Sequence, residues 1–205
     1  MSTTVRGVDG KLRCGWSAAA PEFLVYHDTE WGFPVRDDFR LFEKLILEGF
    51  QSGLSWRTIL AKRESFRKAF FSFDFNRIAR FNDKDVERLL GDEGIVRHRG
   101  KIEAAIHNAR CARELVHREG SLADFVWRYE PDPEQLAAPQ TVSTSPASIL
   151  LSKDLKKLGW KFVGPTTVHA FMQAMGLIND HAAGCVIRAQ VEKTRVTSKR
   201  GDRDM

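Results

Sequence analysis

Four residues of types that bind transition metals lie near the two ends of the sequence. Cys14 and His27 come early, and His181 and Cys185 come late as a His-x3-Cys pair. On a helix, two side chains four residues apart share one face. Two thiolates and two imidazoles are the ligand set of a closed structural zinc site. The spacing leaves a second interpretation open, in which the cysteines are small buried apolar residues and the histidines only form hydrogen bonds.

A single carboxylate is predicted on the apolar face of a helix. Glu48 follows Leu41 by seven residues and Leu45 by three, so all three project from one face. Burial of an unpaired carboxylate costs free energy and serves no structural purpose, which favours a binding role for it. Large rings crowd this part of the sequence: Trp16, Tyr26, Trp31, Phe33 and Trp56.

Aromatic walls around one acid suit a flat, electron-poor heterocycle. The rings would stack on it, and the carboxylate would accept its N–H groups. The alternative is that the rings are ordinary core residues and that Glu48 lies at a fraying helix end. No Gly-rich phosphate fingerprint follows a strand, and the sequence contains no Gly-x-Ser-x-Gly, His-Glu-x-x-His or kinase-type signature.

A glycine-bounded segment separates two late helices. Residues 159–164 read Gly-Trp-Lys-Phe-Val-Gly, and Pro165 follows at a position typical of a first helical turn. Free N–H groups in such a turn and at the helix start can bind a DNA phosphate. The pattern alone is weak evidence, because most segments of this kind are plain helical hairpins.

Helical periodicity dominates the elements that must position these residues. Helices are predicted from Asp37 or Asp38 towards the glycines at 49 and 53, and over about 58–70, 82–90, 98–119, 121–127, 148–158 and 165–175. Residues 130–146 read as a long surface loop. Alternating strand patterns are nearly absent, so the predicted fold class is all-α.

Composition fits one soluble globular domain. The 205 residues are 42% hydrophobic and 29% charged, with a net charge of +5, which excludes disorder throughout and collagen-like classes. Three cysteines do not make a disulfide framework and fit a reducing compartment. We expect a single domain over 12–188, a disordered tail over 1–11 and a disordered, charged tail over 189–205. With no signal peptide or membrane span, we expect a cytoplasmic protein without a membrane partner.

Seven segments, in this order, resemble the bacterial 3-methyladenine DNA glycosylase I family of the helix-hairpin-helix DNA glycosylase superfamily. They are Arg13–Trp16, Tyr26–Gly32, Leu47–Trp56, Gly94–Lys101, Phe125–Trp127, Lys161–Gly164 and Asn179–His181. The resemblance covers about residues 12–186. It implies an all-α helix-hairpin-helix fold in which one structural zinc ion ties the N- and C-terminal segments together.

The resemblance also implies roles for individual residues. Cys14, His27, His181 and Cys185 match the zinc ligands. Glu48 and Tyr26 match the acid and the tyrosine that contact the base, and we assign them as the catalytic residues. Trp56 matches the stacking ring, and Trp16 and Trp31 match other base-binding pocket positions. Gly53 and Leu54 match the segment that fills the gap left by a flipped base, while Lys161 and Gly164 are expected to approach DNA phosphates.

Some positions depart from the family pattern or stay outside its chemistry. Phe50 stands where a polar residue is expected. Asp180 lies near the place of the catalytic aspartate of other helix-hairpin-helix glycosylases, but this family lacks that residue, so Asp180 is not assigned a catalytic role. No lysine matches the lyase nucleophile of bifunctional relatives, which implies a monofunctional enzyme.

The implied activity is hydrolysis of the N-glycosidic bond of 3-methyladenine flipped out of alkylated duplex DNA, a step of base excision repair. Free 3-methyladenine is the product, and the expected enzyme is a cytoplasmic bacterial monomer that associates with the nucleoid while acting on DNA. Trp56 would stack on the cationic ring, while Glu48 and Tyr26 would read its edge. The sequence leaves open whether Glu48 also orients water.

Two other functions are compatible with parts of the sequence. A non-enzymatic DNA-binding module would use the hairpin and the basic surface, but it needs no acid on an apolar helix face. A zinc-stabilised enzyme acting on free nucleosides would use the pocket, but the hairpin with Lys161 favours duplex DNA.

Overall fold

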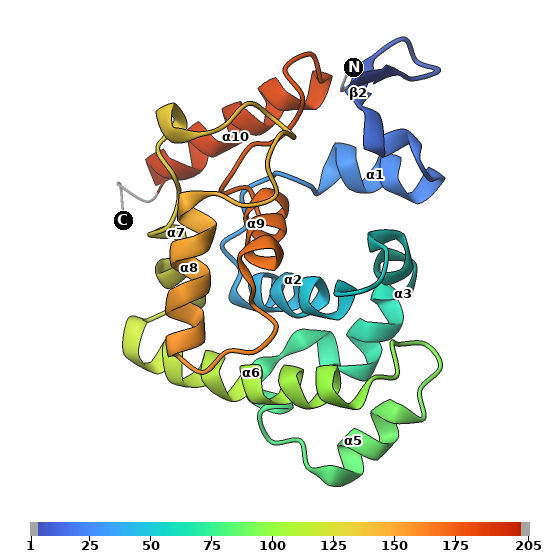
Figure 1. The fold of residues 1–205 in the computed structure, drawn as a ribbon, viewed down its shortest axis with the longest axis vertical. Helices are drawn as coiled ribbons and strands as arrows, with labels where there is room; N and C mark the ends of the chain where they lie inside the picture. The colour runs from blue at the N-terminus through green and yellow to red at the C-terminus, as the bar shows by residue number, and fades with distance from the viewer. Residues whose placement is uncertain (1–3, 202–205) are drawn as a thin grey trace.

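The computed structural model describes residues 4–201, which are mostly helical (Figure 1). The α-helices are α1 (Pro21–Thr29), α2 (Asp38–Gln51), α3 (Trp56–Ala69), α4 (Phe75–Ile78), α5 (Asp83–Leu90), α6 (Arg99–Glu119), α7 (Leu122–Trp127), α8 (Pro146–Lys157), α9 (Pro165–Ala174) and α10 (Val186–Gly201). Short 3-10 helices are η1 (Gly15–Ala18), η2 (Phe71–Phe73) and η3 (Pro133–Gln135). Strands β1 (Thr4–Arg6) and β2 (Leu12–Cys14) pair antiparallel, with Val5 opposite Arg13.

Side-chain caps set the starts of most predicted helices. Asp37 accepts the backbone N–H of Arg40 at the start of α2, and Ser55 accepts that of Thr58 at the start of α3. Asn82 opens α5 with a reciprocal capping box. The side chains of His98 and Ser121 accept a backbone N–H at the starts of α6 and α7, and Ser145 opens α8 with a second capping box. The helix α1, which carries two residues of the site, was not predicted, although Pro21 at its first turn is a start signal.

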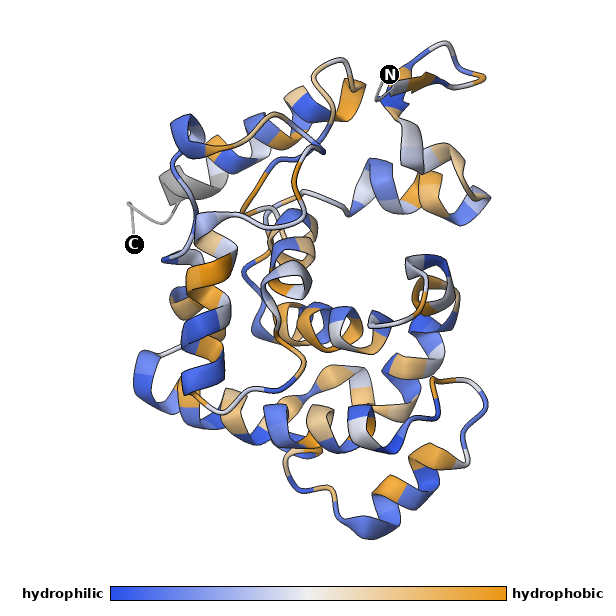
Figure 2. Cartoon of the chain, viewed as in Figure 1, coloured by the Kyte–Doolittle hydropathy of each residue, from blue (hydrophilic) through white to orange (hydrophobic). Residues whose placement is uncertain are grey.

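Helix α2 runs through the middle of the protein and contacts α3, α6, α7 and α9 (Figure 1). Every residue from Leu41 to Phe50 is buried, so this helix has almost no solvent-facing side over its last turns. Apolar residues line its contacts with the neighbouring helices, while polar residues cover the outside of the surrounding ones (Figure 2). None of the described helices is both long and apolar enough to cross a membrane.

The predicted two-helix hairpin is present as α8, residues 158–164 and α9. Asn108 on α6 clamps its turn, because its Oδ1 accepts the N–H of Lys161 at 2.8 Å and its Nδ2 donates to the Lys161 carbonyl at 2.9 Å. Ser152 on α8 donates its hydroxyl to the Val163 carbonyl at 2.6 Å. Gly159 takes a φ of +87°, which only glycine adopts without strain. The turn is therefore a fixed element rather than a loose loop.

Both terminal segments differ from the expected disorder over 1–11 and 189–205. Residues 4–14 form the β1–β2 hairpin, fastened by Arg13, which pairs with Asp9 at 2.8 Å and with Asp28 at 2.9 Å. Residues 186–201 form α10, which contacts β2. The remaining parts of the expected tails, residues 1–3 and 202–205, lie outside the described residues.

A buried arginine explains why a polar C-terminal sequence forms a docked helix. Arg195 is buried on α10, and its guanidinium donates to the Gly176 carbonyl just after α9. It also pairs with Glu130 at 2.6 Å, far away in sequence. The low hydrophobicity of this segment predicted disorder. That prediction is wrong because the tertiary contacts of Arg195 cannot be inferred from local composition.

Removing this guanidinium tests the docking of α10. We expect Arg195→Met to lower the free energy of unfolding by about 3–5 kcal/mol, since a buried pair that loses one partner leaves the other charge uncompensated. Lys193→Met, an exposed change on the same helix, should have little effect. Equal stability of both variants in urea denaturation would show that α10 is not held by Arg195.

Candidate functional site

An open pocket of about 280 Å³ lies where α1, α2, α3 and α9 meet. Its lining residues are Trp16, Phe23, Tyr26, Trp31, Lys44, Glu48, Gln51, Trp56, Ala170 and Gln173. The sequence-based cluster is therefore largely brought together, although Phe33 is not among the lining residues. Trp16 meets Trp31 edge-on at 5.0 Å between ring centroids, and Tyr26 lies 5.5 Å from Trp56.

Glu48 enters this pocket from the buried face of α2, as predicted. It is only 6% exposed, because α2 turns that face towards α1 and α9. The expectation of an unpaired carboxylate is wrong, however. The ammonium of Lys44, one turn earlier on α2, lies 2.7 Å from Glu48 Oε1.

Lys44 also contacts the other polar and aromatic groups of the pocket. Its Nζ donates to the Tyr26 hydroxyl at 2.9 Å and lies 3.3 Å from the centroid of the Trp56 ring. Burial lowers the pKa of Lys44, although the neighbouring Glu48 carboxylate opposes that shift. Burial, with Glu48 close by, raises the pKa of Tyr26 well above its ordinary range. The pocket thus holds the Lys44 cation between an acid, a hydroxyl and an indole face.

Two glutamines that no sequence pattern singled out complete the polar edge of the pocket. Gln51 ends α2, and Gln173 lies on α9. Gln173 Nε2 donates to Asp180 Oδ2 at 2.6 Å, and the backbone N–H of Gln140 donates to Oδ1 at 2.9 Å. Burial raises the pKa of Asp180. Asp180 is not among the pocket-lining residues and reaches the pocket only through Gln173.

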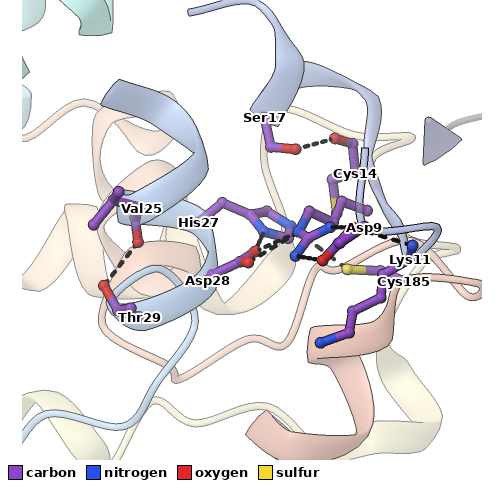
Figure 3. A network of polar contacts seen from close by, with 10 residues as sticks. Asp9, Lys11, Cys14, Ser17, Val25, His27, Asp28, Thr29 and Cys185 are labelled. Atoms are coloured by element: carbon purple, nitrogen blue, oxygen red, sulfur yellow. Dashed lines mark hydrogen bonds and ion pairs between the residues drawn. The ribbon is translucent and has the colours of Figure 1, made fainter. Parts of the chain in front are cut away.

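Three of the four predicted metal ligands form a buried cluster beside the pocket (Figure 3). The ligand atoms of Cys14, His27 and Cys185 all lie within 4.8 Å of one another. His27 Nε2 is 3.5 Å from Cys185 Sγ, and Asp28 Oδ1 is 2.7 Å from His27 Nδ1. A carboxylate on the far ring nitrogen is the usual partner of a metal-binding histidine, because it fixes the tautomer and the ring orientation.

His181, the fourth predicted ligand, lies next to this cluster. Its ring is fully buried and its centroid is 5.0 Å from that of His27. Asn179 Oδ1 lies 2.8 Å from His181 Nδ1, while Nε2 finds no hydrogen-bond partner among the described residues. Gly32 makes room for this ring, since a Cβ there would lie 2.7 Å from His181 Cε1.

The pKa shifts in the cluster agree only in part with the forms that bind a metal. The hydrogen bond between the two thiols lowers the pKa of Cys185 and raises that of Cys14. Burial lowers the pKa of His27, but its hydrogen bonds to Cys185 and Asp28 outweigh burial and raise it. Burial lowers the pKa of His181 to about 4, which keeps this imidazole neutral. Thiolate sulfur and neutral imidazole nitrogen are the forms that bind zinc.

Two tryptophans join the metal-ligand cluster to the pocket. Trp31 lies 4.6 Å from His181 and stacks on His27 at 6.3 Å. Trp16 lies 5.2 Å from His27 and also lines the pocket. The cluster therefore supports the pocket wall from behind.

The residues predicted to approach DNA lie on two segments. Gly53 and Leu54 follow α2 in an exposed loop, where Gly53 has a φ of +78°. Lys101 on α6 holds this loop, because its Nζ donates to the carbonyls of Phe50 at 2.8 Å and Ser52 at 2.6 Å. Lys101 was not identified from the sequence.

The second segment is the hairpin. Lys161 is exposed in its turn, and Gly164 is the residue that starts α9. Lys161 and Phe162 border one small cavity together with Phe50 and Lys101. The hairpin and the end of α2 are thus neighbours.

Comparisons with known proteins show which family this chain resembles. A family model described as methyladenine glycosylase matches residues 16–189. The chain is 49% identical to the DNA-3-methyladenine glycosylase 1 of Escherichia coli, over 84% of this chain and 95% of that protein. It is 41% identical to the DNA-3-methyladenine glycosylase of Haemophilus influenzae, over 84% of this chain and 96% of that protein. A Staphylococcus aureus 3-methyladenine DNA glycosylase I structure, described as showing 3-methyladenine recognition, superposes with a TM-score of 0.81 at 36% identity, covering 85% of this chain and 95% of that one.

Two glycines allow a matched test of the packing around His181. Gly32 and Gly53 have similar positive φ angles, +84° and +78°, but a Cβ meets nothing within 4 Å at Gly53. Alanine at either position costs about 1–2 kcal/mol of backbone strain. We expect Gly32→Ala to cost about 1–3 kcal/mol more, because it must displace the His181 ring. Equal melting temperatures for the two variants would contradict this packing.

Proposed function

Because the chain belongs to the methyladenine glycosylase family, we propose that it excises 3-methyladenine from alkylated duplex DNA by hydrolysing the N-glycosidic bond. The observation that carries this proposal is the pocket in which Glu48, Tyr26 and Trp56 surround one cation. Such a pocket fits a flat base that carries a positive charge.

The chemistry begins with the lesion itself. Methylation at N3 makes the adenine of a nucleotide cationic, so the base is already a good leaving group. Once the nucleotide is flipped out of the duplex, Trp56 stacks on the ring, a contact worth about 0.5–2 kcal/mol. Glu48 and Tyr26 contact the amino edge of the base. The bond between N9 and C1′ breaks with its electron pair going to N9, and water adds to C1′ and releases a proton.

Selectivity follows from the charge of the buried acid. Undamaged adenine is neutral and offers the buried Glu48 carboxylate no positive charge, which disfavours its binding relative to a cationic base. A carboxylate this close to the base can also stabilise the positive charge that develops on the sugar. No lysine matches the lyase nucleophile of bifunctional relatives, so no lyase step is proposed.

DNA is held by the two exposed segments next to the pocket. Leu54, with Gly53 giving the turn, fills the gap that the flipped nucleotide leaves. Lys161 and the free N–H groups near Gly164 at the start of α9 bind phosphates, so α8, the turn and α9 serve as a helix-hairpin-helix DNA anchor. The protein acts as a cytoplasmic monomer that associates with the nucleoid through this anchor.

One structural zinc ion fits the buried cluster. Cys14, His27 and Cys185 would hold it together with His181. The unpartnered, buried Nε2 of His181 and the orientation of His27 by Asp28 support this assignment. The ion would tie the β1–β2 hairpin and α1 to the segment before α10, and it would take no part in the reaction.

Elemental analysis tests the metal. We expect about one zinc per purified chain, lost in Cys185→Ala together with a lower melting temperature. Cys111→Ala is the matched control, because Cys111 is a buried thiol outside the cluster, and this variant should keep its zinc. A fully stable wild-type protein without zinc would rule the site out.

Release of 3-methyladenine from methylated duplex DNA tests the activity. Glu48→Gln preserves size and removes the charge, so we expect a folded protein whose single-turnover excision is at least about tenfold slower, given about 1.5–3 kcal/mol for a hydrogen bond to a charged group. Glu64→Gln removes a 72%-exposed carboxylate on α3 and should excise at the wild-type rate.

The same assay separates the competing functions. Wild-type protein that binds the duplex but releases no base would be a DNA-binding module. Release from methylated nucleosides but not from the duplex would indicate an enzyme of free nucleosides. Wild-type excision by Glu48→Gln would place base recognition elsewhere.

A further inference from the structure

Lys44 occupies the position that the proposed function gives to the base. Its ammonium lies 2.7 Å from Glu48 Oε1, 2.9 Å from the Tyr26 hydroxyl and 3.3 Å from the Trp56 ring centroid. Resting on the proposed function, we infer that Lys44 is an internal competitor of the base. It is a tethered cation that fills the base position of the pocket and that a base must displace to bind.

Lys44 and a bound base cannot use these groups at the same time. A stacked ring lies about 3.5 Å from its partner, which is the distance at which the ammonium already sits over Trp56. The Glu48 oxygen and the Tyr26 hydroxyl that would meet the base are engaged by the same ammonium. All four residues line one open pocket, so the base approaches from that side.

The structure also contains a place to which the ammonium can move. A separate cavity of about 20 Å³ borders Lys44 and Trp56 on the side of Glu30 and Glu43. That volume holds one water-sized group, and an ammonium is of similar size. A rotation of the flexible lysine side chain would take Nζ out of the pocket and into this cavity without any backbone movement.

The second position is less favourable than the first, so the displacement is reversible. Glu30 is already paired with Arg63 at 2.6 and 2.9 Å, and Glu43 is paired with Arg67 at 2.8 Å. Neither carboxylate is free for a new cation, and the two guanidiniums repel one. Lys44 is therefore driven back to Glu48 when the pocket empties.

Every ligand must therefore compensate the free energy that is needed to open the Lys44–Glu48 ion pair. A cationic base replaces the charge of Lys44 on Glu48 and its contact with Trp56, so the lost interactions are regained. A neutral base must open the same buried ion pair and leaves Glu48 without a cation. Displacement lowers the apparent affinity for both, which hinders undamaged adenine and speeds release of the product.

Binding of two methylated bases tests this role. The probes are 3,9-dimethyladenine, a permanent cation that mimics the damaged base in a nucleotide, and neutral 9-methyladenine. We expect Lys44→Met, which keeps the length but removes the charge, to bind both probes at least tenfold more tightly than wild type. Lys68→Met, an exposed change on α3, should bind as wild type does. Unchanged or weaker binding by Lys44→Met overturns the inference, since neither a structural lysine nor one that reads the base would give tighter binding on removal.

A second variant covers the case in which Lys44→Met, with Glu48 left unpaired, does not fold. Lys44→Met/Glu48→Gln removes both charges of the pair, and we expect it to bind 9-methyladenine at least tenfold more tightly than wild type. If the double variant does not bind 9-methyladenine more tightly than wild type, the inference is also overturned. The proposed function is tested separately, by excision of 3-methyladenine from duplex DNA by the wild-type protein.

Discussion

A carboxylate buried on the apolar face of α2 constrains the whole site. Glu48 is 6% exposed, and an acid in such a place needs a cation close by. Lys44 provides that cation at 2.7 Å. Packing of α2 against α3, α6, α7 and α9 fixes the position of the acid, and the open aromatic pocket gives a second cation access to it. The need of one buried charge for a partner thus links the core of the fold to recognition of a charged base.

An N-terminal segment builds the opposite wall of the same pocket. Tyr26 and His27 are consecutive on α1, yet Tyr26 lines the pocket and His27 belongs to the metal-ligand cluster. Trp31 touches His27 and His181 and also lines the pocket. Through these contacts, a metal that never meets the substrate would still decide how firmly the aromatic wall is held.

Much of this arrangement could be predicted from local sequence. Capping residues such as Asp37 and Asn82 marked helix starts, and the periodicity of α2 placed Glu48 on the buried face. The crowding of tryptophans predicted the pocket walls. These features depend on residues close together in the chain, where helical geometry relates sequence to position.

What could not be predicted depends on contacts between distant segments. Arg195 and Glu130 form the ion pair that turns a polar tail into the docked helix α10. Asn108 and Lys101 reach across from α6 to hold the hairpin and the Leu54 loop. The contact between Lys44 and Glu48 is not of this kind, because the two residues are four apart on one helix and their spacing can be seen in the sequence. Helical spacing alone therefore already offers Lys44 as the partner of the acid.

A crystal structure of the protein with 3-methyladenine bound would test the central claim most directly. The account predicts the base stacked on Trp56 with its amino edge at Glu48 and Tyr26, and the Lys44 ammonium displaced from the Trp56 ring. A base bound outside this pocket, or bound while Lys44 keeps its contacts with Glu48 and Trp56, would contradict the account.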